Sequence, residues 1–189
     1  IKNIFLVIFP EFKYLDRIEE LYYLLKANII TQTPEFIFSI FLIDEKNNFE
    51  YFCHKYKISN KLKKDLNFIA KNYKEFKDKK DYLKKDLKKN VYKLGKISIK
   101  KLITFIYCVE KKFTFEMLNK TITQINKMKI PNFPFNGKYL IDQGLEDGKK
   151  IGFALQELEK EWTKNDFNLK NEEVIYIVNK VKKLNILNI

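Results

Sequence analysis

The sequence predicts an all-α protein, an irregular bundle of about eight to ten helices without a substantial sheet. Apolar residues recur at three- and four-residue spacing along most of the chain, and no segment shows the strict alternation of a half-buried strand. Hydrophobic residues make up 46% of the 189 residues, including 17 Phe and 11 Tyr, which is enough to fill a core. We expect two regions, 1–130 with a lysine-rich middle and 131–189 with a glycine-rich turn.

The first helix with a clear pattern is predicted over Tyr14 to Ala27. The preceding apolar run, Ile1 to Phe9, reads equally as a strand or a buried helix, although the helix that follows favours the second. Because the first residue is not methionine, we expect a piece of a longer protein. The predicted inner face of the helix is the following set: Leu15, Ile18, Leu21, Tyr22 and Leu25.

Three helices are predicted next. Thr33 followed by Pro34 is a typical helix start, because proline suits the first helical position, and the apolar run that follows predicts a central helix ending near Ile43. A short helix is expected over Asn47 to Tyr56. Ser59 is the expected N-cap of a longer helix that carries apolar residues on one face and lysines on the others.

Four further helices are expected after these, besides those of the glycine-rich stretch. The first runs from Tyr82 to Leu94 and is ended by Gly95, and the second is capped by Ser98 and ends at Val109. The third covers Phe115 to Met128. The last covers Phe167 to Leu184, with this inner face: Val174, Ile175, Ile177, Val178 and Val181.

Four of the five glycines lie between Gly137 and Trp162. This clustering indicates that the backbone there must adopt positive φ or approach another group closely. Leu140 and Ile141 predict a short helix, and Gly144 is its expected left-handed terminator. Asp147 is the expected cap of a second helix from Gly148 to Trp162. The inner face of that helix is Ile151, Leu155, Leu158 and Trp162.

The start of this second helix is a candidate phosphate site. Helix N-termini present free N–H groups and a positive dipole end, and both favour anions. Lys149 and Lys150 stand in the first turn, where an approaching anion would explain two positive charges. We therefore name Gly148, Lys149, Lys150 and nearby Lys138 as candidate phosphate-binding residues. The alternative is that the glycines only let two helices pack closely.

Net charge is +13, and it is concentrated between Lys55 and Lys101, where 18 lysines face 5 acidic residues. Such a segment suits a negatively charged partner. We expect these lysines to point to solvent: Lys63, Lys64, Lys71, Lys74, Lys84, Lys85, Lys88 and Lys89. The candidate RNA contacts among them are Lys63, Lys64, Lys71, Lys84, Lys85 and Lys88. The alternative is an ordinary solvated face.

The glycine stretch also resembles a known family. The pattern Gly-x-x-Leu-x-x-x-Gly-x-x-x-Gly-x-x-Ile-Gly-x-x-Leu-x-x-Leu-x-x-x-Trp, with Phe133-Pro134 ahead of it, is similar to the C-terminal tail of bacterial CCA-adding tRNA nucleotidyltransferases and poly(A) polymerases. Residues 8 to 43 resemble the segment after the family's catalytic head more loosely. The sequence departs from the family at the turn, where Asp147 and Lys149 replace prolines, and at Tyr139, which replaces an aspartate.

The resemblance implies the tRNA-holding body and tail of such an enzyme, and in this family those parts are all-helical. The catalytic head would hold Mg²⁺ and CTP or ATP through an Asp-x-Asp pair after Gly-Ser, and no Gly-Ser pair occurs here. We therefore expect no catalytic residues and no cofactor in this chain. The expected partner is tRNA, and a split gene product would also need a separate catalytic head subunit.

One alternative function stays open, a stand-alone basic helical scaffold that binds protein or an acidic polymer through its lysines. Cys53 and Cys108 are isolated and are expected to be buried in a reducing compartment. No metal site is expected, because there is one histidine and no Cys/His cluster. No apolar run reaches the length of a membrane span, and we see no signal peptide, so we expect a cytoplasmic protein.

Overall fold

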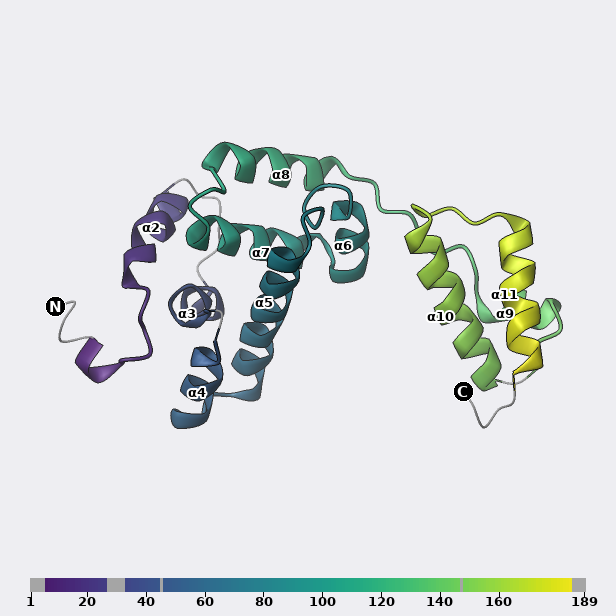
Figure 1. Ribbon diagram of the computed structural model, residues 1–189, viewed down its shortest axis with the longest axis horizontal. Coiled ribbons are helices and arrows are strands. Elements are labelled where there is room, and N and C mark those ends of the chain that lie inside the picture. The colour runs from purple at the N-terminus through teal and green to yellow at the C-terminus, as the bar shows by residue number, and fades with distance from the viewer. Residues whose placement is uncertain (1–5, 27–32, 45, 147, 185–189) are drawn as a thin grey trace. The chain divides into compact units, whose positions relative to one another are not determined.

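The computed structural model describes residues 6–26, 33–44, 46–146 and 148–184, which include ten α-helices, one short 3-10 helix and the helical residues 6–8, and contain no strand (Figure 1). The prediction of an all-α fold is therefore confirmed. The chain divides into two compact units, Ile1–Met128 and Lys129–Ile189, and each is described by itself. The division falls two residues before the boundary expected from the sequence.

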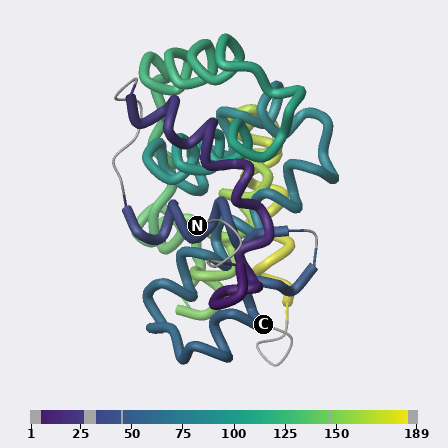
Figure 2. Tube along the Cα trace, turned by 90° about the vertical axis from the view of Figure 1, so that its left-hand side faces the viewer, coloured from purple at the N-terminus to yellow at the C-terminus, as the bar shows by residue number. Residues whose placement is uncertain are grey.

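The first unit is built around α3 and α7. Its elements are η1 (Leu15–Arg17), α2 (Ile18–Lys26), α3 (Pro34–Leu42), α4 (Asn48–Lys55), α5 (Asn60–Asp78), α6 (Leu87–Leu94), α7 (Lys96–Val109) and α8 (Phe115–Lys127). Helix α3 packs against α4, α5 and α7, and α7 also contacts α2, α6 and α8. Figures 1 and 2 both show α7 and α8 as a pair at the top of this unit. These contacts bury much of α3 and α7, which are the most apolar helices of the unit.

The predicted helix start at Thr33 and the predicted N-cap Ser59 are confirmed by hydrogen bonds. The Thr33 hydroxyl accepts from the Phe36 N–H at 3.4 Å at the start of α3. The Ser59 hydroxyl accepts from the Leu62 N–H, also at 3.4 Å, at the start of α5. Both residues satisfy backbone donors that a helix start leaves without partners.

Three predicted helix starts were wrong. The last helix, expected from Phe167, begins at Asn171, and Phe167 lies outside it with φ +66°. The helix expected from Tyr82 begins at Leu87, and residues 80–86 form a series of turns instead. The Asp86 N–H donates to the Asp81 carbonyl within these turns. Helix α7 begins at Lys96, so Ser98 lies inside it and is not its cap. Gly95 lies between α6 and α7 with φ +82°, as expected of a terminator.

The inner faces of two helices differ from the prediction. On α2 the buried residues are Leu21 and Leu24, whereas Ile18 and Tyr22 are 51% and 67% exposed. On α11 (Asn171–Lys183), Ile175 is 52% exposed, although Val174, Val178 and Val181 are buried as expected. Apolar spacing allows neighbouring stripes on one helix, and the packing partner selects one of them.

The segment before η1 packs against the helices of the first unit through aromatic rings. Phe12 lies within 5.4 Å of Phe52 and 5.9 Å of Phe38, measured between ring centroids. Beside it, the Glu11 carboxylate pairs with the Lys55 ammonium at 2.8 Å. Leu6 to Ile8 is helical, and the earlier part of the predicted apolar run lies outside the described residues.

The second unit contains α9 (Gly137–Asp142), α10 (Gly148–Lys164) and α11. Helix α10 packs against both of the others. The buried core of this unit consists of Leu140, Leu145, Ala154, Leu158, Val174, Val178 and Val181. The predicted helix from Gly148 is confirmed, with Leu158 and Trp162 buried and Ile151 and Leu155 half-buried.

Candidate nucleic-acid interface

The connection from α9 to α10 is a tight turn built on Gly144. This residue has φ +81°, and its N–H donates to the Ile141 carbonyl at 2.7 Å. The Leu145 N–H donates to the Leu140 carbonyl at 3.0 Å, and both leucine side chains enter the core. The prediction that Gly144 terminates the short helix in the left-handed region is therefore confirmed.

The backbone geometry does not require glycine at the other three positions of the stretch. The interpretation that all four glycines meet a local requirement of the backbone was therefore wrong for these three. None of Gly137, Gly148 and Gly152 has positive φ. A Cβ at Gly148 or Gly152 would meet nothing within 4 Å, and one at Gly137 would make ordinary contact with Ile151 at 3.6 Å. The predicted cap Asp147 lies outside the described residues. Gly148 is exposed, so the backbone at the start of α10 is open to solvent.

The two lysines at the start of α10 have different surroundings. The Lys150 ammonium donates to the Lys182 carbonyl at 2.9 Å and so satisfies a carbonyl in the last turn of α11. Lys149 is exposed, whereas Lys150 is half-buried. The Lys182 ammonium lies beside the turn, 3.3 Å from where a Cβ on Gly144 would stand. Lys150 therefore has a structural role, and Lys149 is the more exposed of the pair.

The candidate lysines of the first unit lie on α5, on the turns after it and on α6. Lys63, Lys64 and Lys71 are exposed on α5. Lys84 and Lys85 are exposed in the turns over residues 80–86. Lys88 and Lys89, at the start of α6, are half-buried, so the expectation that they point fully to solvent was wrong.

Two of these lysines line one pocket between α5, the turns and α6, which we call the α5/α6 pocket. Its volume is about 390 Å³. The lining residues are Lys64, Asn67, Phe68, Lys71, Asn72, Glu75, Lys79, Tyr82, Asn90, Lys93 and Leu94. Four lysines and one glutamate give it a positive balance. Lys79 and Lys93 were not among the predicted contacts. Lys79 is the residue that follows α5, whereas Lys93 lies on α6 and is brought back beside α5 by the turns.

A second pocket in the first unit, between α4 and α5, has a volume of about 680 Å³ but no such charge bias. Lys46, Lys71, Lys74 and Lys77 line it together with Asp44, Glu50 and Asp78. Lys77 also pairs with Glu110 at 3.2 Å. Its mixed charges make it a weaker candidate for a polyanion than the α5/α6 pocket.

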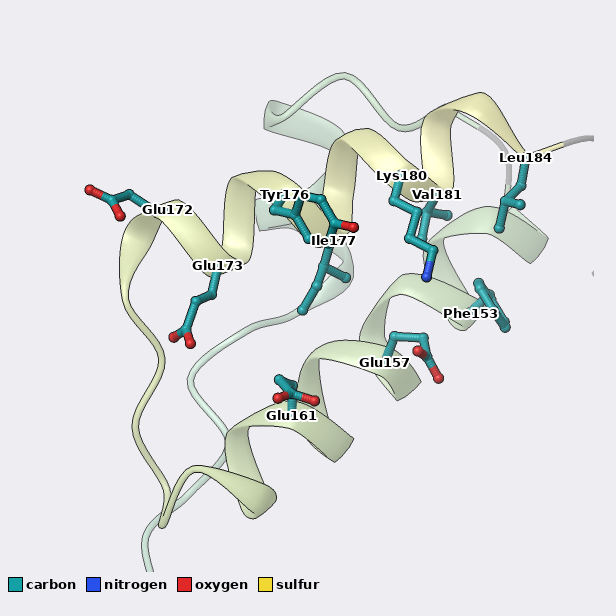
Figure 3. Close-up of a pocket in the computed structure, with 10 residues that line it drawn as sticks. All are labelled: Phe153, Glu157, Glu161, Glu172, Glu173, Tyr176, Ile177, Lys180, Val181 and Leu184. Atoms are coloured by element: carbon teal, nitrogen blue, oxygen red, sulfur yellow. The ribbon is translucent and has the colours of Figure 1, made fainter.

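The second unit has a groove of about 700 Å³ between α10 and α11, shown in Figure 3. Glu157 and Glu161 on α10 and Glu172 and Glu173 on α11 line it, with Lys180 on α11. Four carboxylates around an apolar floor repel phosphate, so this groove is not a candidate RNA contact.

The predicted contacts thus form two sets. Lys63, Lys64, Lys71, Lys84, Lys85 and Lys88 belong to the first unit, and Lys138, Gly148, Lys149 and Lys150 belong to the second. Lys138 is exposed on the first turn of α9. Among the described residues, no group of three His, Cys, Asp or Glu side chains has the arrangement of a metal site. No helix in the described parts of the chain has the length and apolar character to cross a membrane.

Part of the sequence is similar to curated proteins. Over 57 residues it is 35% identical to the mitochondrial CCA tRNA nucleotidyltransferase 1 of Danio rerio, which is 30% of this chain and 13% of that protein. It is 29% identical over 59 residues to the Homo sapiens protein of the same name, which is 31% of this chain and 14% of the relative. The Mus musculus protein is 27% identical over 59 residues, with the same coverage.

No family model matches the sequence, and no solved structure matches it. The similarity spans about one seventh of the length of the curated relatives. The similarity to CCA tRNA nucleotidyltransferases therefore covers a little under a third of this chain.

Proposed function

We propose that this chain is the tRNA-holding, C-terminal part of a CCA-adding tRNA nucleotidyltransferase, or of a poly(A) polymerase of the same family. The observation that carries the proposal is the partial match to three CCA tRNA nucleotidyltransferases. The glycine stretch supports the C-terminal placement and the likeness to bacterial members, because it follows the family's tail pattern.

The charge distribution supports RNA as the partner. The first unit holds 27 basic and 15 acidic side chains, a net charge of +12, whereas the second holds 10 and 9. Lysines bind phosphates as point charges and do not distinguish bases, which suits a module that holds the RNA backbone. We assign the contacts of the first unit to the lysines of α5 and of the turns after it.

The second unit supplies a smaller contact at the start of α10. The exposed backbone at Gly148 and the exposed side chain of Lys149 can face one phosphate, and Lys138 lies on the neighbouring helix. The helix has 17 residues, so its dipole adds to the attraction. Nucleotide addition would need Mg²⁺ and a triphosphate held by a catalytic head, which we place outside this sequence.

The proposal is tested by filter binding of tRNA and of duplex DNA at several salt concentrations. We expect tRNA to bind more tightly than DNA. For each phosphate contacted, the logarithm of the association constant should fall by about 0.7 to 0.9 per tenfold rise in salt concentration. The double variant Lys138→Glu/Lys149→Glu should weaken tRNA binding about tenfold or more. We leave Lys150 unchanged because its ammonium bonds to α11.

The matched control is Lys111→Glu/Lys112→Glu, which makes the same charge change at exposed positions between α7 and α8. We expect the control to lose much less affinity for tRNA. Equal affinity for tRNA and DNA in the unchanged protein would contradict the proposal and favour the basic scaffold. Equal losses in the two double variants would show that total charge alone drives binding.

A further inference from the structure

The α5/α6 pocket has a rigid, hydrogen-bonded floor. Tyr82 is 1% exposed, and its hydroxyl donates to the Asn72 amide oxygen at 3.1 Å. The Asn72 amide nitrogen donates to the Phe68 carbonyl at 2.7 Å. The Asn90 amide nitrogen donates to the Tyr82 carbonyl at 2.8 Å. These bonds tie the turns and α6 to α5, so the pocket is preformed and its shape does not depend on a ligand.

The other residues that line the pocket include lysines, asparagines and apolar side chains. Lys64 and Lys71 come from α5, Lys79 from the end of that helix and Lys93 from α6. All four lysines are exposed, so their side chains are accessible to a ligand. Lys79 pairs with Glu75 at 3.2 Å, so Glu75 offsets one of the four charges. The pocket therefore keeps a surplus of about three positive charges.

Two asparagines offer acceptors to a ligand. The Asn67 and Asn90 amide nitrogens donate to the Lys63 and Tyr82 carbonyls, both at 2.8 Å. Within the described residues no donor is recorded for the two amide oxygens. Phe68 and Leu94 add half-buried apolar surface. A pocket of about 390 Å³ with cations, amide acceptors and apolar surface fits a small ligand that has a phosphate and a flat polar ring.

We propose that the α5/α6 pocket binds one nucleotide through its phosphate, either an unpaired nucleotide of an RNA strand or a free nucleotide. The lysines hold the phosphate, and Asn67, Asn90 and Phe68 contact the base. Unpaired bases suit this chemistry because their faces and edges are open, whereas those of a duplex are stacked and paired. The RNA form of this proposal rests on the proposed function, since it makes the pocket one part of the tRNA contact.

The test is a competition assay with the full chain and a fluorescent single-stranded RNA hexamer. The competitors are unlabelled hexamer, the same sequence as a duplex, cytidine monophosphate and inorganic tripolyphosphate. The single strand should compete at least about tenfold better than the duplex. If cytidine monophosphate competes as well as the hexamer, the ligand is a free nucleotide. If tripolyphosphate competes as well as both, the pocket reads charge alone and the proposal is wrong.

Two variants locate the binding in the pocket. Lys64→Gln/Lys93→Gln should weaken hexamer binding about tenfold, because it removes one cation from α5 and one from α6. Glu75→Gln should strengthen it several-fold, because it removes the opposing charge, and a misfolded variant could not give this gain. The control is Lys111→Gln/Lys112→Gln, with an unchanged helical circular dichroism spectrum required of all variants.

Failure of this proposal is distinct from failure of the proposed function. Hexamer binding that the pocket variants leave unchanged would overturn the pocket, even if tRNA still bound more tightly than DNA. Loss of the tRNA preference with a pocket that still binds the hexamer would instead overturn the proposed function.

Discussion

At the scale of single residues, the one arginine of the sequence has a structural role. The Arg17 guanidinium donates to the Ile40 carbonyl at 2.7 Å and to the Ile43 carbonyl at 3.0 Å, at the C-terminal end of α3. It also lies 3.8 Å from the centre of the Tyr14 ring. A planar group with several donors can satisfy two helix carbonyls at once, and lysine cannot do so in the same fixed geometry.

The two cysteines are also structural, and both are buried as expected. Burial raises the pKa of the Cys108 thiol to about 12. It raises the pKa of the Cys53 thiol as well. Both groups therefore stay protonated near neutral pH, which removes the thiolate that cysteine chemistry needs.

Glu11 is expected to make stability depend on pH. Burial by itself would raise its pKa, but the hydrogen bond from Lys55 and the further bond from Tyr56 outweigh it, so the pKa lies below the ordinary value of 4.5. Its stabilising effect is complete above that ordinary value and is lost as pH falls through the lowered pKa. Glu11→Gln should therefore lower the urea midpoint at pH 7, and the difference should shrink at about pH 3.

The matched control for this change is Glu50→Gln, which removes an exposed carboxylate from α4. Its urea midpoint should stay close to that of the unchanged protein at both pH values. A Glu11→Gln deficit that is as large in acid as at neutral pH would contradict the ionic explanation, because it would indicate a packing defect.

At the scale of the elements, the glycine stretch shows that one residue type can have different structural roles at different positions. Gly144 requires the left-handed region, whereas Gly152 lies within α10 with open space where a side chain would begin. The same substitution should therefore have opposite effects at the two positions.

Gly144→Ala should destabilise the second unit by about 1–2 kcal/mol, which is the cost of a left-handed L-residue. Gly152→Ala should stabilise it by about 0.5–1 kcal/mol, because alanine loses less backbone entropy than glycine in a helix. Urea unfolding followed by Trp162 fluorescence measures both. Loss of stability in Gly152→Ala would mean that the close approach of another group requires this glycine.

At the scale of the whole molecule, each of the two units has buried apolar residues of its own. The first includes Leu102 and Ile103 on α7, and the second includes Leu158 on α10. The only tryptophan, Trp162, lies in the second unit. Fluorescence therefore follows the second unit alone, whereas circular dichroism follows the helices of both.

Leu102→Ala should make the first unit unfold at a lower urea concentration than the second. Leu102 is fully buried, so its truncation should cost about 2–5 kcal/mol of stability. We expect the circular dichroism transition to begin at lower urea, with the Trp162 transition unchanged. Leu158→Ala is the matched change and should shift the fluorescence transition. A joint shift of both signals in either variant would show that the units unfold as one.

The sequence alone determined the all-α class, the helix start at Thr33, the Ser59 cap, the Gly144 terminator and the position of the lysine-rich segment. These features depend on local rules, namely helical periodicity, side-chain capping and the conformational freedom of glycine. The position of the lysine-rich segment was predicted by counting charges along the chain, which requires no knowledge of the fold.

Only the tertiary structure decided which stripe of α2 and of α11 is buried, where α6 begins and which lysines share a pocket. Ile18 and Ile175 have the right spacing to be buried, but no partner helix covers them among the described residues. The α5/α6 pocket exists because Tyr82, buried against α5, brings Lys93 back beside Lys64. Contacts between residues so far apart in sequence depend on packing in three dimensions, which periodicity along one helix does not encode.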